Sequence, residues 1–136
     1  ERTYEGEPAM KLESLAMKGK DILKLEPIME GDTLNTTQLL LKVFENREKL
    51  PKPDLAYSAH TYLAKGLAML AIEKALENHV KTIGFSGGVA CNEIMTSTMR
   101  RIVESSGLRF LVHEAIPPGD GGLSLGQAFV AGSSSL

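Results

Sequence analysis

The sequence of 136 residues contains no tryptophan and a single cysteine, Cys91. One cysteine cannot form an internal disulfide, and this favours a protein of the reducing cytoplasm. No apolar run approaches the ~20 residues that span a bilayer, so we expect no membrane partner. The formal net charge is −2 and the one local basic cluster is Arg100 with Arg101, so we expect no nucleic-acid partner.

The start of the chain also lacks features of a leader. Residues 1–4 (ERTY) include no initiating methionine, basic region or apolar region, so no signal peptide is predicted. The sequence resembles a cut through a longer protein. Its 43% hydrophobic and 24% charged residues are typical of a soluble globular domain, and 136 residues are enough to build one core.

The most informative stretch that is present is 81–92 (KTIGFSGGVACN). Its apolar run at 82–85 predicts a strand, the glycine pair allows a tight turn, and Asn92 can cap a helix that begins at Glu93. Glycines let a ligand approach the main chain, and free N–H groups at the start of a helix suit a phosphate or a polar ribose. The stretch is therefore a candidate nucleotide site, although the glycine pair alone is equally typical of a simple loop turn.

A second strand and a second glycine turn follow. The helix from Glu93 is predicted to run to about Ser105 with Gly107 as its stop, and 108–113 (LRFLVH) predicts a strand, so the three elements are expected to form a parallel βαβ unit with a right-handed crossover. The segment 115–122 (AIPPGDGG) then turns and places Asp120 at the same carboxyl edge of the sheet as the first glycine turn. Ligands bind at this edge in open α/β sheets, so two glycine turns there favour a binding site.

The rest of the chain is predicted to be mostly helical. Helical spacing covers 7–18, a stretch from Asn35 or Thr36 to before Pro51, 54–78 and 123–131, while alternation predicts a short half-buried strand at 21–28. The helix at 54–78 is apolar on nearly all sides, so we expect it to be central, between other layers. The predicted fold class is therefore α/β, with a parallel βαβ unit and a long central helix. A flexible tail is predicted at 133–136.

Four blocks of the sequence resemble one family. They are residues 3–16 (TYEGEPAMKLESLA), 56–64 (AYSAHTYLA), 86–92 (SGGVACN) and 117–128 (PPGDGGLSLGQA). Together they look like the carboxy-terminal part of HypF, the carbamoyltransferase of nickel-iron hydrogenase maturation. The block 86–92 is also similar to the related tRNA threonylcarbamoyltransferase family, TsaD. The resemblance implies a partial actin-like ATPase lobe (ASKHA, ribonuclease H-like), with 1–132 as the carboxy-terminal lobe of the carbamoyltransferase domain.

The resemblance also implies a chemistry. Carbamoyl phosphate would be hydrolysed elsewhere in the full protein, and carbamate would be joined to AMP from ATP. The carbamoyl group of this carbamoyl-adenylate would pass to the carboxy-terminal cysteine of the partner protein HypE. This transfer would belong to the domain of which the sequence is a part. The implied cofactors are ATP and a divalent metal (Mg, Zn or Fe), and the implied partner is a HypE-like acceptor.

Site residues follow from the same resemblance. The nucleotide-binding residues would be Gly6, Glu7, Gly87, Gly88 and Asn92, and the metal ligand would be Asp120. The family's paired histidine ligands, His-x-x-x-His, do not occur in this sequence and would lie upstream of it. Structural alternatives stay open, because Asp120 and Asn92 can also cap helices and Glu7 can favour the positive end of the first helix.

The remaining chemistry-bearing side chains are interpreted as structural. We expect His60 to be a hydrogen-bonded core histidine, His79 to mark a helix end, and His113 to end a strand, with contact to the nucleotide as its alternative. A thiol near a helix start, such as Cys91, can act as a nucleophile. We disfavour that role because the accepting thiol of the implied chemistry belongs to HypE. The methionines Met10, Met69, Met95 and Met99 are spaced as core filler.

Three functions are weighed for the segment. In the favoured one, the segment carries half of a HypF nucleotide site. It contains no catalytic residue, so we expect it to be inactive alone. We also expect it to expose an apolar interlobe surface, through which it could self-associate. The second is a TsaD-like transferase acting on tRNA, which the lack of a basic face disfavours. The third is a non-catalytic nucleotide-binding scaffold that has kept the fold and lost the chemistry.

Overall fold

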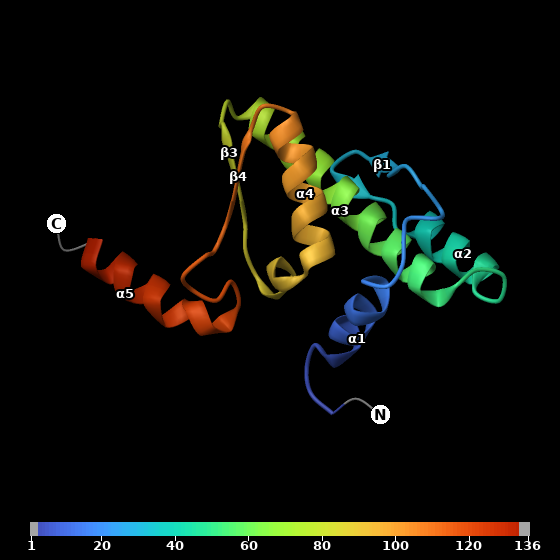
Figure 1. Ribbon diagram of the computed structural model, residues 1–136. Coiled ribbons are helices and arrows are strands. Elements are labelled where there is room, and N and C mark those ends of the chain that lie inside the picture. Colours follow the sequence, from blue (N-terminus) through green and yellow to red (C-terminus); the bar gives the residue numbers. More distant parts are fainter. Residues whose placement is uncertain (1–2, 134–136) are drawn as a thin grey trace.

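The computed structural model describes residues 3–133 (Figure 1). In chain order the elements are α1 (Glu7–Ala16), β1 (Met29–Glu30), β2 (Thr33–Leu34), α2 (Thr37–Asn46), α3 (Lys52–Glu77), β3 (Thr82–Phe85), the 3-10 turn η1 (Gly88–Cys91), α4 (Glu93–Ser105), β4 (Arg109–Val112), the 3-10 turn η2 (Asp120–Gly122) and α5 (Leu123–Ser133). The predicted α/β class is confirmed.

The long helix α3 is the central element, as predicted. It contacts α1, α2, α4 and β3, and it runs across the molecule between α4 and α2 (Figure 1). Ala64 and Ala68 of α3 are fully buried, and their small side chains let α4 approach closely. The main core cluster consists of Ala64, Ala68, Ala75, Met95, Met99, Val103, Leu108 and Phe110. The core therefore lies between α3, α4 and β4.

The elements β3, α4 and β4 form the predicted parallel βαβ unit. Thr82 lies opposite Arg109 and Phe85 lies opposite Val112 in the parallel register. Gly107, directly after α4, has a φ of +77°, a left-handed conformation in which glycine commonly ends helices. Because the strands are parallel, their carboxyl ends lie at one edge of the sheet, and the loops that follow them are neighbours.

The strand predicted at 21–28 is wrong. This segment is not part of a sheet, and the antiparallel hairpin of β1 and β2 comes after it. A side chain of α3 takes the place of a strand partner, since the Ser58 hydroxyl accepts hydrogen bonds from the N–H groups of Ile22 (3.0 Å) and Leu23 (3.1 Å). The segment instead bends at Lys24, which has φ +46°, and three of its N–H groups bind side chains of α3, since Ile28 donates to the Tyr62 hydroxyl as Ile22 and Leu23 donate to Ser58.

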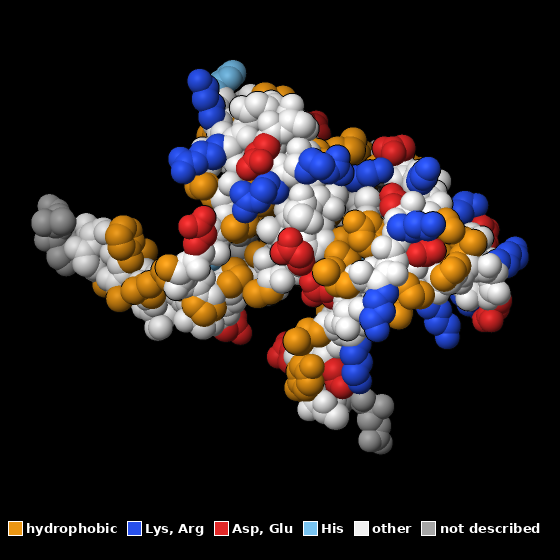
Figure 2. Space-filling view, viewed as in Figure 1, with side chains coloured by type: hydrophobic (Ala, Val, Ile, Leu, Met, Phe, Trp, Pro, Cys, Tyr) orange, Lys and Arg blue, Asp and Glu red, His pale blue; other side chains and the backbone are white. Residues whose placement is uncertain are grey.

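Two helices expose most of their apolar side chains. The exposed residues are Leu123, Leu125, Phe129 and Val130 on α5, and Leu40, Leu41 and Phe44 on α2. No residue of α5 is buried, and Figure 2 shows this helix as an arm with apolar side chains that projects from the body of the molecule. Monomeric soluble proteins rarely expose large apolar patches. The expected exposed apolar surface is present, and self-association through it stays a prediction.

Smaller differences from the expectations concern side chains and element ends. Met10 and Met69 are exposed, so their predicted role as core filler is wrong, whereas Met95 and Met99 are buried as predicted. The helix α5 includes Ser133, the first residue of the predicted tail, and 134–136 lie outside the described residues. Among the helices of residues 3–133, none combines the length and apolar character needed to cross a membrane.

Candidate functional site

The loops after β3 and β4 are tied together at the carboxyl edge of the sheet. The N–H of Gly87 donates a hydrogen bond to the carbonyl oxygen of Pro118 (2.7 Å), and the Ser86 hydroxyl donates to the same oxygen (3.2 Å). The Ser86 Oγ also lies 3.0 Å from Nε2 of His113, the residue after β4. The two glycine turns therefore share one edge, as predicted.

The partners of Ser86 determine what this serine-histidine pair can do. A hydroxyl has one proton, so Ser86 can donate to the Pro118 carbonyl or to Nε2 of His113, but not fully to both. When the proton is on the bond to Pro118, Nε2 carries a hydrogen and His113 is a donor; only the other tautomer could act as a base toward Ser86. The predicted strand end at His113 is confirmed. Nothing local in the sequence indicates its partner, which lies 27 positions earlier.

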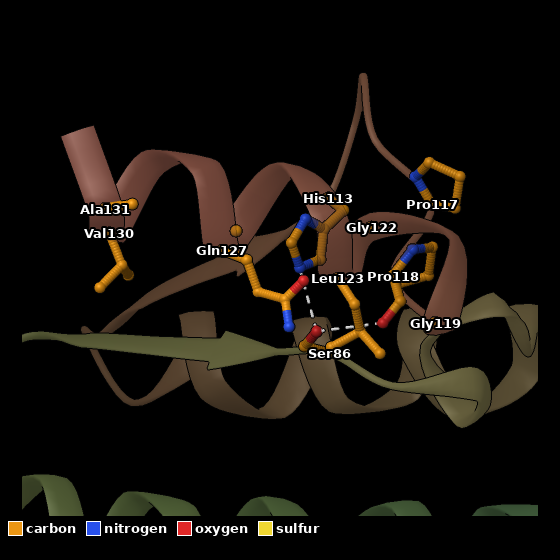
Figure 3. A pocket seen from close by; sticks show the side chains of 11 residues that line it. Ser86, His113, Pro117, Pro118, Gly119, Gly122, Leu123, Gln127, Val130 and Ala131 are labelled. Atoms are coloured by element: carbon orange, nitrogen blue, oxygen red, sulfur yellow. Dashed lines mark hydrogen bonds between the residues drawn. The ribbon is translucent and has the colours of Figure 1, made fainter.

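A cavity of about 570 Å³ opens beside this pair (Figure 3). Its lining includes Ser86, His113, the loop 117–119 and one face of α5. Figure 3 shows the side chain of Gln127 extending from α5 toward Ser86 and His113. The volume lies within the range of small-molecule sites, about 300–1,000 Å³. The cavity thus combines an apolar helix face with a few polar groups at the strand ends.

Asp120 lies at the rim of this cavity. Its neighbours Gly119 and Gly122 line the cavity, whereas Asp120 itself is exposed at the start of η2. Within residues 3–133, no hydrogen bond or ion pair engages its side chain. The helix-cap alternative for Asp120 therefore has no bond to support it, and the carboxylate is accessible from solvent where the two loops meet.

Gly87 and Gly88 place different demands on the backbone. Gly87 has φ +94° and ψ 173°, a conformation essentially restricted to glycine, whereas the φ of Gly88 is not in the left-handed region. A Cβ added at either position would meet no atom within 4 Å. The space beside both glycines is open, which is the property that a close approach of ligand to main chain requires.

The first turn of α4 is capped by two side chains. Oδ1 of Asn92 accepts a hydrogen bond from the N–H of Met95 (2.9 Å), so the predicted cap is present. Oε1 of Glu13 in α1 accepts one from the N–H of Glu93 (2.8 Å). The sequence predicts that the N–H groups at the start of α4 are free to bind a phosphate. This prediction is wrong for the N–H groups of Glu93 and Met95, which already bind side chains. Asn92 keeps its side-chain NH₂ group as a donor for a ligand.

Gly6 and Glu7 begin α1, and no hydrogen bond or ion pair joins them to the glycine turn after β3 within the described part of the chain. Gly6 forms the expected turn, with φ +82°. The buried Glu7 carboxylate binds the Lys11 ammonium (2.6 Å) through one oxygen and Thr3 through the other. Lys11 above all, and then Thr3, lower the pKa of Glu7 because they favour the carboxylate. This arrangement supports the helix-start role of Glu7.

Asp120 is one candidate metal ligand rather than a complete site. No group of three His, Cys, Asp or Glu side chains in residues 3–133 could hold a metal ion. Asp120 offers a single hard oxygen, which fits a divalent cation only when further ligands come from elsewhere. His60 is not available, because it is buried and its Nδ1 is hydrogen-bonded to the carbonyl oxygen of Ala56 (2.8 Å), as predicted for a core histidine. Cys91 is exposed in η1.

A family model described as "Carbamoyltransferase, Kae1-like Domain, second subdomain" matches residues 1–127. The probable carbamoyltransferase HypF of Methanocaldococcus jannaschii is 38% identical over 130 residues, which are 93% of this chain and 17% of that protein. The chain belongs to the HypF carbamoyltransferase family. The family resemblance that the four sequence blocks indicate is thereby confirmed.

Solved HypF structures have the same fold as this segment. The crystal structure of T. kodakarensis HypF matches 96% of the chain with a TM-score of 0.85 and 48% identity. A full-length HypF described as a phosphate- and nucleotide-bound form matches 96% of it with a TM-score of 0.81 and 26% identity. The segment spans 17% and 18% of those two chains, so it corresponds to a small part of HypF.

The HypF segment is also similar to a tRNA-modifying enzyme. The tRNA N6-adenosine threonylcarbamoyltransferase of Nanoarchaeum equitans is 26% identical over 101 residues, which are 74% of this chain and 32% of that protein. The predicted relation to the TsaD family is confirmed by this match.

Proposed function

We propose that the segment forms one side of the ATP site of a HypF-type carbamoyltransferase, as one lobe of an actin-like ATPase (ASKHA) domain. The observation that carries the proposal is the 2.7 Å hydrogen bond from Gly87 to Pro118, which holds two glycine turns at one sheet edge. A relative described as nucleotide-bound supports it. Gly87 and Gly88 would let the ribose approach the main chain, and the amide of Asn92 would donate to a ribose hydroxyl.

Asp120 would supply one oxygen ligand to a divalent metal ion near the nucleotide phosphates. Such an ion, when bound, neutralises phosphate charge and orients the phosphates. Its other ligands would come from the larger HypF polypeptide, and Mg, Zn and Fe all remain candidates. Gly6 and Glu7 would stand on the other side of the nucleotide. Glu7 would have to exchange a bond to Lys11 or Thr3 for a sugar hydroxyl, so its contribution depends on a local rearrangement.

In the proposed reaction of the full-length protein, carbamoyl phosphate is hydrolysed to carbamate and phosphate, and a carbamate oxygen then attacks the α-phosphorus of ATP, which forms carbamoyl-adenylate and releases pyrophosphate. The carboxy-terminal cysteine of a HypE-like acceptor then attacks the carbamoyl carbon as a thiolate, the bond from that carbon to the AMP oxygen breaks, and AMP leaves. Residues of this segment would bind and orient the nucleotide during both steps. None of them is assigned to bond making, so the isolated segment would be inactive.

A transfer assay tests the proposal. The full-length polypeptide that contains this segment is mixed with ATP, carbamoyl phosphate and a HypE-like acceptor, and the acceptor is analysed by mass spectrometry. We expect one carbamoyl group on its last cysteine, and loss of the product in a Gly88→Val variant, whose side chain would fill the space beside the turn. Modification of a tRNA adenosine instead would favour the TsaD-like function that the Nanoarchaeum equitans relative suggests. Nucleotide binding without either product would favour the scaffold.

The apolar face of α5 is proposed to be the interlobe surface. It lies beside the candidate cavity, and none of its residues is buried within the segment. In the full-length protein the preceding part of the carbamoyltransferase domain would cover it. A second copy would cover it when the segment is isolated, which gives the self-association expected from the sequence.

A further inference from the structure

Glu13 joins the helix α1 to the start of α4. Its Oε1 accepts a hydrogen bond from the N–H of Glu93 at 2.8 Å, across 80 positions of sequence. The N–H of Glu93 is one of the first four of α4, which have no partner inside the helix. Glu13 is half-buried and Glu93 is exposed, so solvent reaches this bond, and the role of the acceptor is to satisfy an N–H group that has no partner in the helix. The proposed function leaves Glu13 without a role.

An apolar contact supports the same junction. Ala16 of α1, Ala56 of α3 and Ile94 of α4 form a small buried cluster in which Ala16 is fully inaccessible. Glu13 and Ala16 are three positions apart, so they lie on one face of α1. That face of α1 therefore makes two contacts with the start of α4: the hydrogen bond from Glu93 and the packing of Ile94 against Ala16.

The junction connects the residues assigned to the two sides of the nucleotide. Asn92 is the N-cap of α4, directly before Glu93, and it ends the turn that begins at Gly87. The position of the Glu93 N–H therefore fixes the position of Asn92. On the other side, α1 begins with Gly6 and Glu7. The helix α1 packs mainly on α3, and the bond from Glu93 to Glu13 ties it directly to the end of the glycine turn.

We infer that Glu13 is a positioning residue of the nucleotide site, which acts by holding α1 at a fixed distance from the start of α4. The inference rests on the proposed function. What matters in this role is the reach of the side chain and its acceptor oxygen, and not its negative charge. A glutamine at this position keeps both the length and an acceptor. An aspartate keeps the charge but is shorter by one methylene, so the bond can form only if α1 moves.

Two substitutions in the full-length protein separate these properties. Glu13→Gln is expected to bind ATP within about twofold of the wild type, and Glu13→Asp about tenfold more weakly, since the shorter side chain loses or strains one hydrogen bond. Isothermal titration calorimetry measures the affinities. Hydrogen exchange of the amides at the start of α4 should be faster only in Glu13→Asp. Glu104→Gln is the matched control, because it neutralises an exposed carboxylate at the other end of α4 and should change neither quantity.

Several outcomes would overturn the inference. A reversed order, with Glu13→Asp like the wild type and Glu13→Gln weakened, would assign the effect to charge. Equal affinities of all three proteins would show that the junction does not position the site. Equal losses in both variants would show that the bond needs the charge of Glu13 as well as its length, which contradicts a role through reach and an acceptor oxygen alone. Failure of the wild type to bind ATP would instead reject the proposed function, and the exchange rates would still show whether Glu13 holds α1 to α4.

Discussion

Gly87 donates its N–H to the carbonyl oxygen of Pro118 at 2.7 Å, and this bond joins the loop after β3 to the loop after β4. The same carbonyl oxygen accepts the hydroxyl of Ser86. Both bonds lie at the carboxyl ends of two parallel strands, where the nucleotide is proposed to bind. The shape of the site therefore depends on the backbone conformation of Gly87.

Gly87→Ala is expected to lower both stability and ATP affinity. At φ +94° and ψ 173°, a residue with a Cβ is strained by about 1–3 kcal/mol unless the loop moves and loses its bond to Pro118. Chemical denaturation and titration calorimetry of the full-length protein measure the two effects. An alanine variant that matches the wild type in both would show that this conformation does not shape the site.

Gly88→Ala is the matched control for folding. Gly88 lies outside the left-handed region and has open space around it, so the free energy of unfolding should change by less than about 0.5 kcal/mol. The ATP affinity should still fall, because the added methyl group occupies the space through which the ribose approaches. Unchanged ATP affinity in this variant would place the ligand elsewhere.

Gly19→Ala is expected to destabilise the fold by about 1–3 kcal/mol or more. A Cβ at Gly19 would lie 2.2 Å from the carbonyl oxygen of Pro53, a backbone atom that cannot move aside without shifting the start of α3. Gly84→Ala, on an exposed strand position with nothing within 4 Å, is the control and should be neutral or slightly stabilising. Urea denaturation compares the two variants, and similar midpoints would contradict the close approach of Gly19 to Pro53.

Glu7 is expected to make stability depend on pH. Its pKa in the folded chain is lowered, chiefly by Lys11, so its contribution is present above the ordinary glutamate pKa and is lost as the pH falls through the lowered value. Glu7→Gln should therefore be less stable than the wild type at neutral pH, with a difference that shrinks in acid. Denaturation from neutral to acidic pH checks this, with Glu5→Gln as a neighbouring control. A difference that grows in acid would contradict the assignment.

Phe129→Ser is expected to reduce self-association of the isolated segment. Phe129 is 75% exposed on a helix with no buried residue, so its removal takes away a large part of the apolar face of α5. Sedimentation over a range of concentrations should show association of the wild type and a shift toward monomer in the variant. Phe44→Ser on α2 should have little effect. A wild type that stays monomeric at high concentration would reject α5 as a self-associating surface.

The βαβ unit could be predicted closely because several local signals coincide there. An apolar run ends at Phe85, Asn92 caps the next helix and Gly107 ends it, and the structure has the same bounds for β3 and α4. The segment 21–28 could not be predicted in the same way. Alternating side chains favour a strand, but they reveal neither the bend at Lys24 nor that N–H groups of the segment bind the hydroxyl of Ser58 instead of a neighbouring strand.

The outline of the candidate site could also be predicted, but not its internal contacts. Parallel strands align their carboxyl ends, so the sequence was enough to bring the two glycine turns to one edge. The bridge of Ser86 to His113 and the bond of Glu13 to Glu93 join residues far apart in the chain. Such contacts depend on the packing of whole helices and strands, and no periodicity or motif in one sequence records them.

The metal-dependent ATP affinity of the full-length protein, compared between the wild type and Asp120→Asn, tests the central claim most directly. Asp120 is exposed and engaged by no hydrogen bond or ion pair of residues 3–133, so its substitution should leave stability within about 0.5 kcal/mol. We predict ATP binding at least about tenfold weaker in the variant when a divalent metal is present, and equal binding when the metal is chelated. Equal ATP affinity and equal metal content in both proteins would contradict the account.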